Sequence, residues 1–177
     1  MLCISLSPPY GSLVALLLKR LETRGWSTSF RGPLAIHQTA APGPKGTTEA
    51  ALWDRCLSEP FRSALASKGI DNPARLPRGK IVAVVELREC SMIGLLPDGT
   101  PTYMAYDTFP PVLQAVQEPE LSFGLYTPGR WAWLLSNVVA LAEPVPARGM
   151  PGLWQPDAPA LAAIAEQLDS ARTPVLR

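Results

Sequence analysis

The alternation of apolar and polar residues predicts β-structure towards both ends of the chain. Residues 2–7, LCISLS, place Leu2, Ile4 and Leu6 on one face of a short strand. The stretch at 31–38, RGPLAIHQ, predicts a second strand. The stretch at 80–90, KIVAVVELREC, is β-branched and nearly all apolar, which is typical of a strand covered on both faces. A fourth strand is predicted at 130–143, with a bend near Ser136 and Asn137 and with Trp131 and Trp133 together on a core-facing side.

Helical patterns occupy the intervening segments and the C-terminal region. GSLVALLLKRL, at 11–21, predicts a short buried helix. Helical periodicity at 49–69 is interrupted by Pro60. Residues 97–120 are rich in proline and read as irregular, with one helical turn near 112–116. A C-terminal helix is predicted at about 157–171, with Asp157 as its N-cap and Ile164 and Leu168 on its packing face.

The order of these patterns predicts an α+β fold in which a small mixed β-barrel or curled sheet is surrounded by helices. A helical insertion at about 40–78 lies between Pro/Gly loops and separates the N-terminal strands from the later ones. With 177 residues, the chain suits a single domain, residues 1–177, with one substantial core.

Composition narrows the function classes. The chain is 47% hydrophobic and 18% charged, as a globular protein is, and its formal net charge is +1. A long footprint on duplex nucleic acid needs many phosphate contacts, so this charge favours a small local basic pocket instead. The apolar run at 12–18 is too short to span a bilayer and no basic segment precedes it, so we expect no membrane partner and a cytoplasmic location.

Metal chemistry is not indicated by the sequence. The three cysteines, Cys3, Cys56 and Cys90, are scattered and form no CxxC pair, and His37 is the only histidine. We therefore expect no metal site and no cofactor, with the cysteines acting as small buried hydrophobes. His37 ends a predicted strand and is expected to be structural.

The stretch LKRLETRGW, residues 18–26, carries the candidate chemistry. It places Lys19, Glu22 and Arg24 within six residues, with Trp26 directly behind them. One interpretation is a solvated ion-pair cluster, which would contribute about 0–1 kcal/mol. The other is a pocket in which the cations bind a phosphate or a base carbonyl and Glu22 accepts from an exocyclic amine. As a residue of a cleft, Lys19 would be replaceable without loss of the fold.

Three segments, read together, resemble the ASCH domain family of the PUA-like superfamily: LSPPYGSLVALLLKRLETRGW, KIVAVVELREC and GRWAWLLSNVVALAEPVPARGMPGLW. The family motif is Gly, any residue, Lys, two residues, Glu, any residue, Arg; Lys19, Glu22 and Arg24 match it, whereas its glycine position holds Leu17. The resemblance covers about residues 2–154, with 40–78 as a variable insertion. Leucine resists the left-handed conformation that glycine provides at a helix end, so either the helix continues to Lys19 or the turn has changed.

The resemblance implies a PUA-like mixed β-barrel that recognises RNA or nucleotides. It implies a ligand pocket built on the three motif residues, with Tyr10 at its rim. Trp26 either stacks a base or packs in the core, and Arg130 either faces the pocket or closes a turn.

Three functions remain open. The leading one is a binding module for single-stranded RNA or DNA, or for a modified nucleoside. The alternative is an ASCH-type hydrolase, an N4-acylcytidine amidohydrolase or an RNA hydrolase, with Lys19 or Glu22 as base and Arg24 at the oxyanion. Deacylating members resemble this chain less closely, because they hold Thr where it holds Glu22. The third is a protein-interaction domain without a nucleotide ligand.

Overall fold

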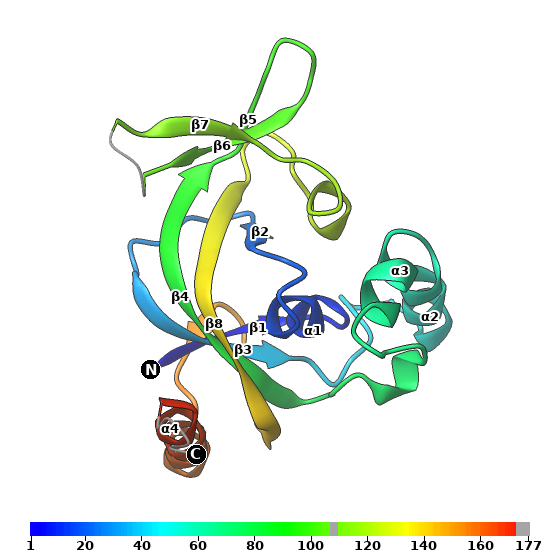
Figure 1. Ribbon diagram of the computed structural model, residues 1–177, viewed down its shortest axis with the longest axis vertical. Coiled ribbons are helices and arrows are strands. Elements are labelled where there is room, and N and C mark those ends of the chain that lie inside the picture. Colours follow the sequence, from blue (N-terminus) through cyan, green and yellow to red (C-terminus); the bar gives the residue numbers. More distant parts are fainter. Residues whose placement is uncertain (107–109, 173–177) are drawn as a thin grey trace, which may run out of the picture.

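The computed structural model describes residues 1–106 and 110–172. Its elements curl around one side of the molecule, with helices inside and beside the curl (Figure 1). In chain order they are β1 (Leu2–Leu6), α1 (Tyr10–Ala15), β2 (Leu21–Arg24), β3 (Gly32–Gln38), α2 (Glu49–Leu57), α3 (Phe61–Ala66), η1 (Pro73–Arg75), β4 (Lys80–Met92), β5 (Gly94–Leu95), β6 (Pro101–Ala105), β7 (Val112–Ala115), η2 (Leu121–Phe123), β8 (Trp131–Pro146), β9 (Leu153–Trp154) and α4 (Ala158–Arg172).

The main sheet has six strands in the order β2-β8-β4-β3-β1-β9. It is mixed, because β1 pairs with β3 in parallel and the other pairs are antiparallel. The long strands β4 and β8 form its centre, and three register shifts along their pairing let them curve strongly (Figure 1). One of these shifts lies beside Ser136, and Asn137 has a φ of 47°, so the predicted bend is confirmed.

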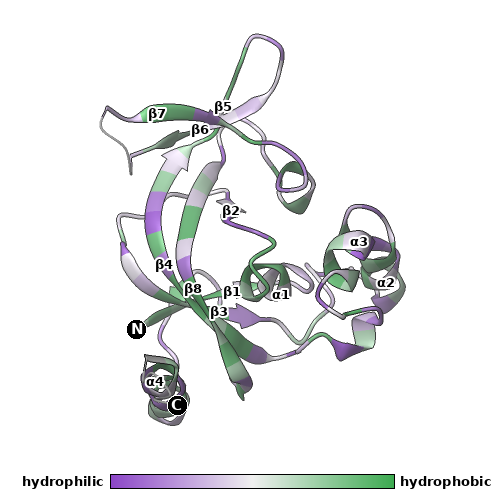
Figure 2. Cartoon of the chain, viewed as in Figure 1, coloured by the Kyte–Doolittle hydropathy of each residue, from purple (hydrophilic) through white to green (hydrophobic). Residues whose placement is uncertain are grey.

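Both faces of the central strands are covered, as the apolar run at 80–90 predicts. Val82, Val85 and Leu87 pack in one cluster with Trp133, while Val84 packs on the other side beneath α4. Figure 2 shows this as a concentration of hydrophobic residues where β4 begins and β8 ends. The predicted α+β class, a small curled mixed sheet with helices around it, is confirmed.

A second sheet of three strands, β5-β6-β7, extends from one end of β4 and β8 (Figure 1). It was not predicted, and the helical turn expected near 112–116 is wrong, because Val112–Ala115 pairs with β6 as a strand. A short segment without a cap or an apolar stripe takes the conformation that its neighbour stabilises. Residues 107–109, within the stretch expected to be irregular, lie outside the described residues.

The helix predicted at 11–21 ends at Ala15, and Leu17 explains why. Its φ is 62°, so the leucine adopts the left-handed conformation usually reserved for glycine. The Leu18 amide donates to the Leu13 carbonyl at 2.8 Å and the Leu17 amide to the Val14 carbonyl at 3.0 Å, which is the Schellman arrangement. The turn is thus kept despite the missing glycine. The side chain is 65% exposed, so the strain is not offset by burial.

The segment 40–78 contains α2, α3 and η1 and packs beside α1 (Figure 1). Leu52, Cys56 and Phe61 are buried against Leu13 and Phe123. At the other end of the sheet, α4 begins where Asp157 accepts from the Ala160 amide at 2.9 Å, and its Ile164 and Leu168 pack onto the sheet as predicted.

Candidate functional site

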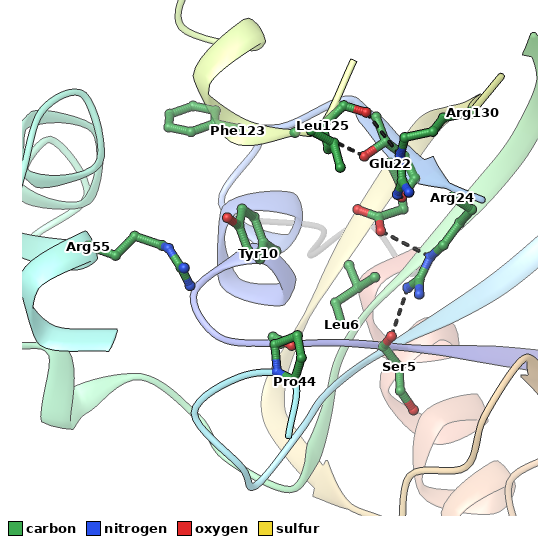
Figure 3. A pocket seen from close by; sticks show the side chains of 13 residues that line it. Ser5, Leu6, Tyr10, Glu22, Arg24, Pro44, Arg55, Phe123, Leu125 and Arg130 are labelled. Atoms are coloured by element: carbon green, nitrogen blue, oxygen red, sulfur yellow. Dashed lines mark hydrogen bonds and ion pairs between the residues drawn. The ribbon is translucent and has the colours of Figure 1, made fainter. Parts of the chain in front are cut away.

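A pocket of about 380 Å³ lies between the main sheet and the 40–78 segment (Figure 3). Six parts of the chain form its wall: the end of β1, the start of α1, β2, the segment from Phe123 to Leu125, Arg130 just before β8, and residues Pro44 and Arg55 of the 40–78 segment. Of the six predicted ligand-binding residues, Tyr10, Glu22, Arg24 and Arg130 line it, whereas Lys19 and Trp26 do not.

Glu22 and Arg24 form the polar side of the pocket. They lie two positions apart on β2, and their side chains therefore point to the same face. Arg24 Nε lies 3.1 Å from Glu22 Oε1, and its Nη2 donates to the Ser5 carbonyl at 2.8 Å (Figure 3). Both side chains are partly exposed, at 13% for Glu22 and 24% for Arg24, so the pair is accessible to a ligand. At the edge of a base, the carboxylate can accept a hydrogen bond and the neighbouring guanidinium can donate one.

Lys19 lies behind this wall and not on it. Only 1% of the side chain is exposed. Its Nζ donates to the carbonyls of Leu21 and, at 2.7 Å, Phe123. It also lies 3.8 Å from Glu22 Oε2 and 3.7 Å from Glu120 Oε1. The expectation that Lys19 is a cleft lysine is therefore wrong, because its buried ammonium joins β2 to η2. We expect its loss to weaken the fold.

Glu120, which sequence reasoning missed, completes this buried network. Its carboxylate accepts from the Arg20 amide at 2.7 Å, the Leu21 amide at 3.2 Å and the Tyr126 hydroxyl at 3.0 Å. Burial and then the charge of Glu120 raise the pKa of Tyr126 well above its usual value. The network fixes the start of β2 and thereby the direction of Glu22.

Arg130 connects β2 to the loop beside the pocket. Its Nε donates to the Leu125 carbonyl at 3.1 Å and its Nη2 to the Thr23 carbonyl at 3.1 Å. Of the two roles left open by the sequence, the structure shows both, since Arg130 lines the pocket and closes the contact between β2 and the segment at 123–125.

Tyr10 forms the aromatic wall and contacts two residues from the 40–78 segment, Phe61 and Arg55. Its ring packs edge-on against Phe61, with centroids 6.0 Å apart, and Arg55 Cζ lies 5.8 Å from its centroid. Burial raises the pKa of the Tyr10 hydroxyl, and the charge of Arg55 opposes that shift. Arg55 was not predicted. Arg55 lies 45 positions after Tyr10, in a segment that the sequence indicated to be an accessory insertion.

Trp26 and His37 lie elsewhere. Trp26 is 38% exposed and packs edge-on against Trp133, with centroids 4.7 Å apart. His37 is buried, with Nδ1 3.2 Å from Ser5 Oγ and Nε2 3.1 Å from the Ala147 carbonyl, and burial lowers its pKa. Both ring nitrogens are engaged, as expected of a structural histidine.

The pocket has a cationic balance. Its titratable lining is Arg24, Arg55, Arg130 and Glu22, together with the phenol of Tyr10. Three guanidinium groups against one carboxylate favour an anionic ligand. Among residues 1–106 and 110–172, no group of three or more His, Cys, Asp or Glu side chains is arranged to hold a metal ion. In the same residues, every helix is too short or too polar to cross a bilayer.

No protein-family model matches the chain. It is similar to Activating signal cointegrator 1 from Homo sapiens and from Mus musculus, each 26% identical over 156 residues. The match covers 88% of this chain but 22% of each relative, so the chain spans about a fifth of their length. Similarity at this distance supports the ASCH resemblance in part. Because it covers so little of each relative, it does not bear on the activity of the whole relative.

Proposed function

We propose that this chain is a nucleic-acid-binding module whose pocket takes one nucleotide unit of single-stranded RNA or DNA. The observation that carries the proposal is the composition of the pocket, in which three arginines, one glutamate and the Tyr10 ring surround about 380 Å³. Arginine binds phosphate and base edges, and an aromatic ring can stack a base. The distant cointegrator similarity agrees with the ASCH resemblance, which implies RNA or nucleotide recognition.

In this proposal the motif residues divide their work. Glu22 accepts from an exocyclic amine of the base, and Arg24 donates to a carbonyl oxygen beside it, because their side chains lie together and partly exposed. Lys19 does not touch the ligand; it holds Glu22 and the start of β2 in place from behind. A small pocket also suits the net charge of +1 better than a long groove does.

Fluorescence anisotropy with short single-stranded RNA and DNA oligonucleotides tests the proposal. Arg24→Gln removes a pocket cation, whereas Arg75→Gln removes an exposed cation that pairs with Asp71 outside the pocket. We expect R24Q to weaken binding about tenfold, since a hydrogen bond to a charged group contributes about 1.5–3 kcal/mol. The R75Q protein should bind like the wild type.

Two results would overturn the proposal. If the wild type binds no single-stranded oligonucleotide at low salt, the pocket is not a nucleic-acid site. If R24Q and R75Q weaken binding equally, binding is diffuse and does not use the pocket. Rapid hydrolysis of an N4-acylated cytidine by the wild type, lost in Glu22→Gln, would instead favour the amidohydrolase.

A further inference from the structure

The 40–78 segment supplies a cation to the pocket through a fixed helix. α2 begins at Glu49, after Thr48 accepts from the Ala51 amide at 3.1 Å. Leu52 and Cys56 are buried in the cluster that includes Leu13 and Phe123. Since Leu52 and Cys56 lie three residues before and one residue after Arg55, their burial sets the rotation of the helix and directs Arg55 towards Tyr10 in the pocket (Figure 3).

The two ends of the segment are also tied to each other at its base. Arg78 donates to the Ala40 carbonyl and forms an ion pair with Glu49, in which Nη2 lies 2.8 Å from Oε1. This contact joins the start of the segment, the start of α2 and the approach to β4. Arg55 is therefore presented from a packed helix and not from a free loop.

Arg55 differs from the other two arginines of the pocket in its partners. Arg24 is engaged by Glu22 and the Ser5 carbonyl, and Arg130 by two backbone carbonyls. Within the described part of the chain, the guanidinium of Arg55 has no carboxylate or carbonyl partner, and its contact is the face of Tyr10. A half-buried guanidinium with five donors is more weakly hydrated than an ammonium group and suits bidentate recognition of a phosphate.

The position of Glu22 decides which end of a ligand meets Arg55. Figure 3 shows Glu22 and Arg24 on one side of the pocket and Arg55 on the other, with Tyr10 between them. A phosphate beside Glu22 would face a carboxylate, whereas beside Arg55 it would face only a cation and an aromatic ring. The base edge therefore belongs at Glu22 and Arg24, and the anionic end at Arg55.

We propose that Arg55 is the phosphate-binding residue of this pocket and that its ligand class is a phosphorylated nucleotide, as opposed to an unphosphorylated nucleoside. This inference rests on the proposed function and goes further by dividing the pocket into a base end and a phosphate end. Tyr10 is assigned a positioning role, because its ring holds the guanidinium from one face while the N–H edge stays directed at the ligand.

Isothermal titration of the full chain with the four common nucleosides and their 5′-monophosphates tests this assignment. The variants are Arg55→Gln, which removes the charge, and Arg55→Lys, which keeps the charge but loses the planar fork. The matched control is Arg62→Gln, an exposed arginine of the same segment that pairs with Glu59 outside the pocket. Thermal melting of each variant verifies that it is folded.

We expect the wild type to bind at least one monophosphate about tenfold or more tightly than its nucleoside. R55Q should abolish this preference by weakening monophosphate binding far more than nucleoside binding, R55K should keep part of the preference, and R62Q should keep all of it. If R55Q retains the full preference, or weakens nucleoside and monophosphate equally, Arg55 is not the phosphate-binding residue although the pocket still binds nucleotides. If the wild type binds neither monophosphates nor oligonucleotides, the proposed function itself fails.

Discussion

Replacing the buried lysine behind the pocket is expected to destabilise the whole fold. Lys19→Met keeps an unbranched side chain of similar length, so it removes the ammonium group without leaving a large cavity. The substitution leaves the carbonyls of Leu21 and Phe123 without their donor, and it leaves Glu22 and Glu120 without a shared cation.

The size of this effect follows from burial. Removing one partner of a buried ion pair costs about 3–5 kcal/mol, because the other charge is left uncompensated. Glu22 and Glu120 keep 13% and 17% exposure, so water can reach them in part and the lower end of the range applies. We expect K19M to lose about 3 kcal/mol of unfolding free energy. For a chain of this size that corresponds to a decrease in Tm of roughly 6–12 °C.

Urea denaturation followed by tryptophan fluorescence measures this loss. Lys68→Met serves as the control, because Lys68 is an exposed lysine just after α3 and should change the unfolding free energy by about 0.5 kcal/mol or less. If K19M and K68M unfold at the same urea concentration, Lys19 is not the structural residue described above.

Two further predictions concern stability. In thermal melts, Leu17→Gly should raise the unfolding free energy by about 0.5–1 kcal/mol, because removing a leucine from the left-handed conformation outweighs the greater chain entropy of glycine. Leu17→Ala should give no comparable gain. Equal gains in both variants would rule out the backbone explanation. His37 has a pKa lowered from 6.5 by burial, so the unfolded state binds a proton first. The unfolding free energy should be at its full value above about pH 6.5 and should fall as the pH drops below that value. The Tyr10→Phe variant should show the same decrease, whereas His37→Gln should not. An unchanged decrease in H37Q would assign the effect to other groups.

The sequence predicted those elements whose pattern depends on local periodicity and on burial. A few consecutive residues suffice to predict the apolar run of β4, the shared face of Trp131 and Trp133, and the capped C-terminal helix. β7 could not be predicted in this way, because its four residues are exposed and take their conformation from pairing with β6.

The site was harder to predict, because its contacts join distant parts of the chain. The short motif places Glu22 and Arg24 side by side, since alternation along a strand is a local property. The burial of Lys19 depends on Phe123 and Glu120, which lie about one hundred positions away. The residues near Lys19 in the sequence do not indicate these contacts. Arg55 reaches Tyr10 only because the 40–78 segment folds back onto α1.

This arrangement gives the 40–78 segment a functional position. It contributes Pro44 and Arg55 to the pocket wall and packs against the same cluster that supports Phe123. A change in the segment would therefore alter the pocket as well as stability. Glu22 and Arg24 face Arg55 of the segment across one cavity (Figure 3).

Mapping of amide chemical shifts by NMR tests directly whether a single-stranded nucleic acid occupies this pocket. A short oligonucleotide is titrated into the isotope-labelled chain, and the shifted amides are placed on the structure. We expect the shifted amides to cluster at Ser5, Glu22 to Arg24, Arg55 and the segment from Phe123 to Leu125. Shifts confined to the β5-β6-β7 sheet or to α4, or no shifts at saturating oligonucleotide, would contradict it.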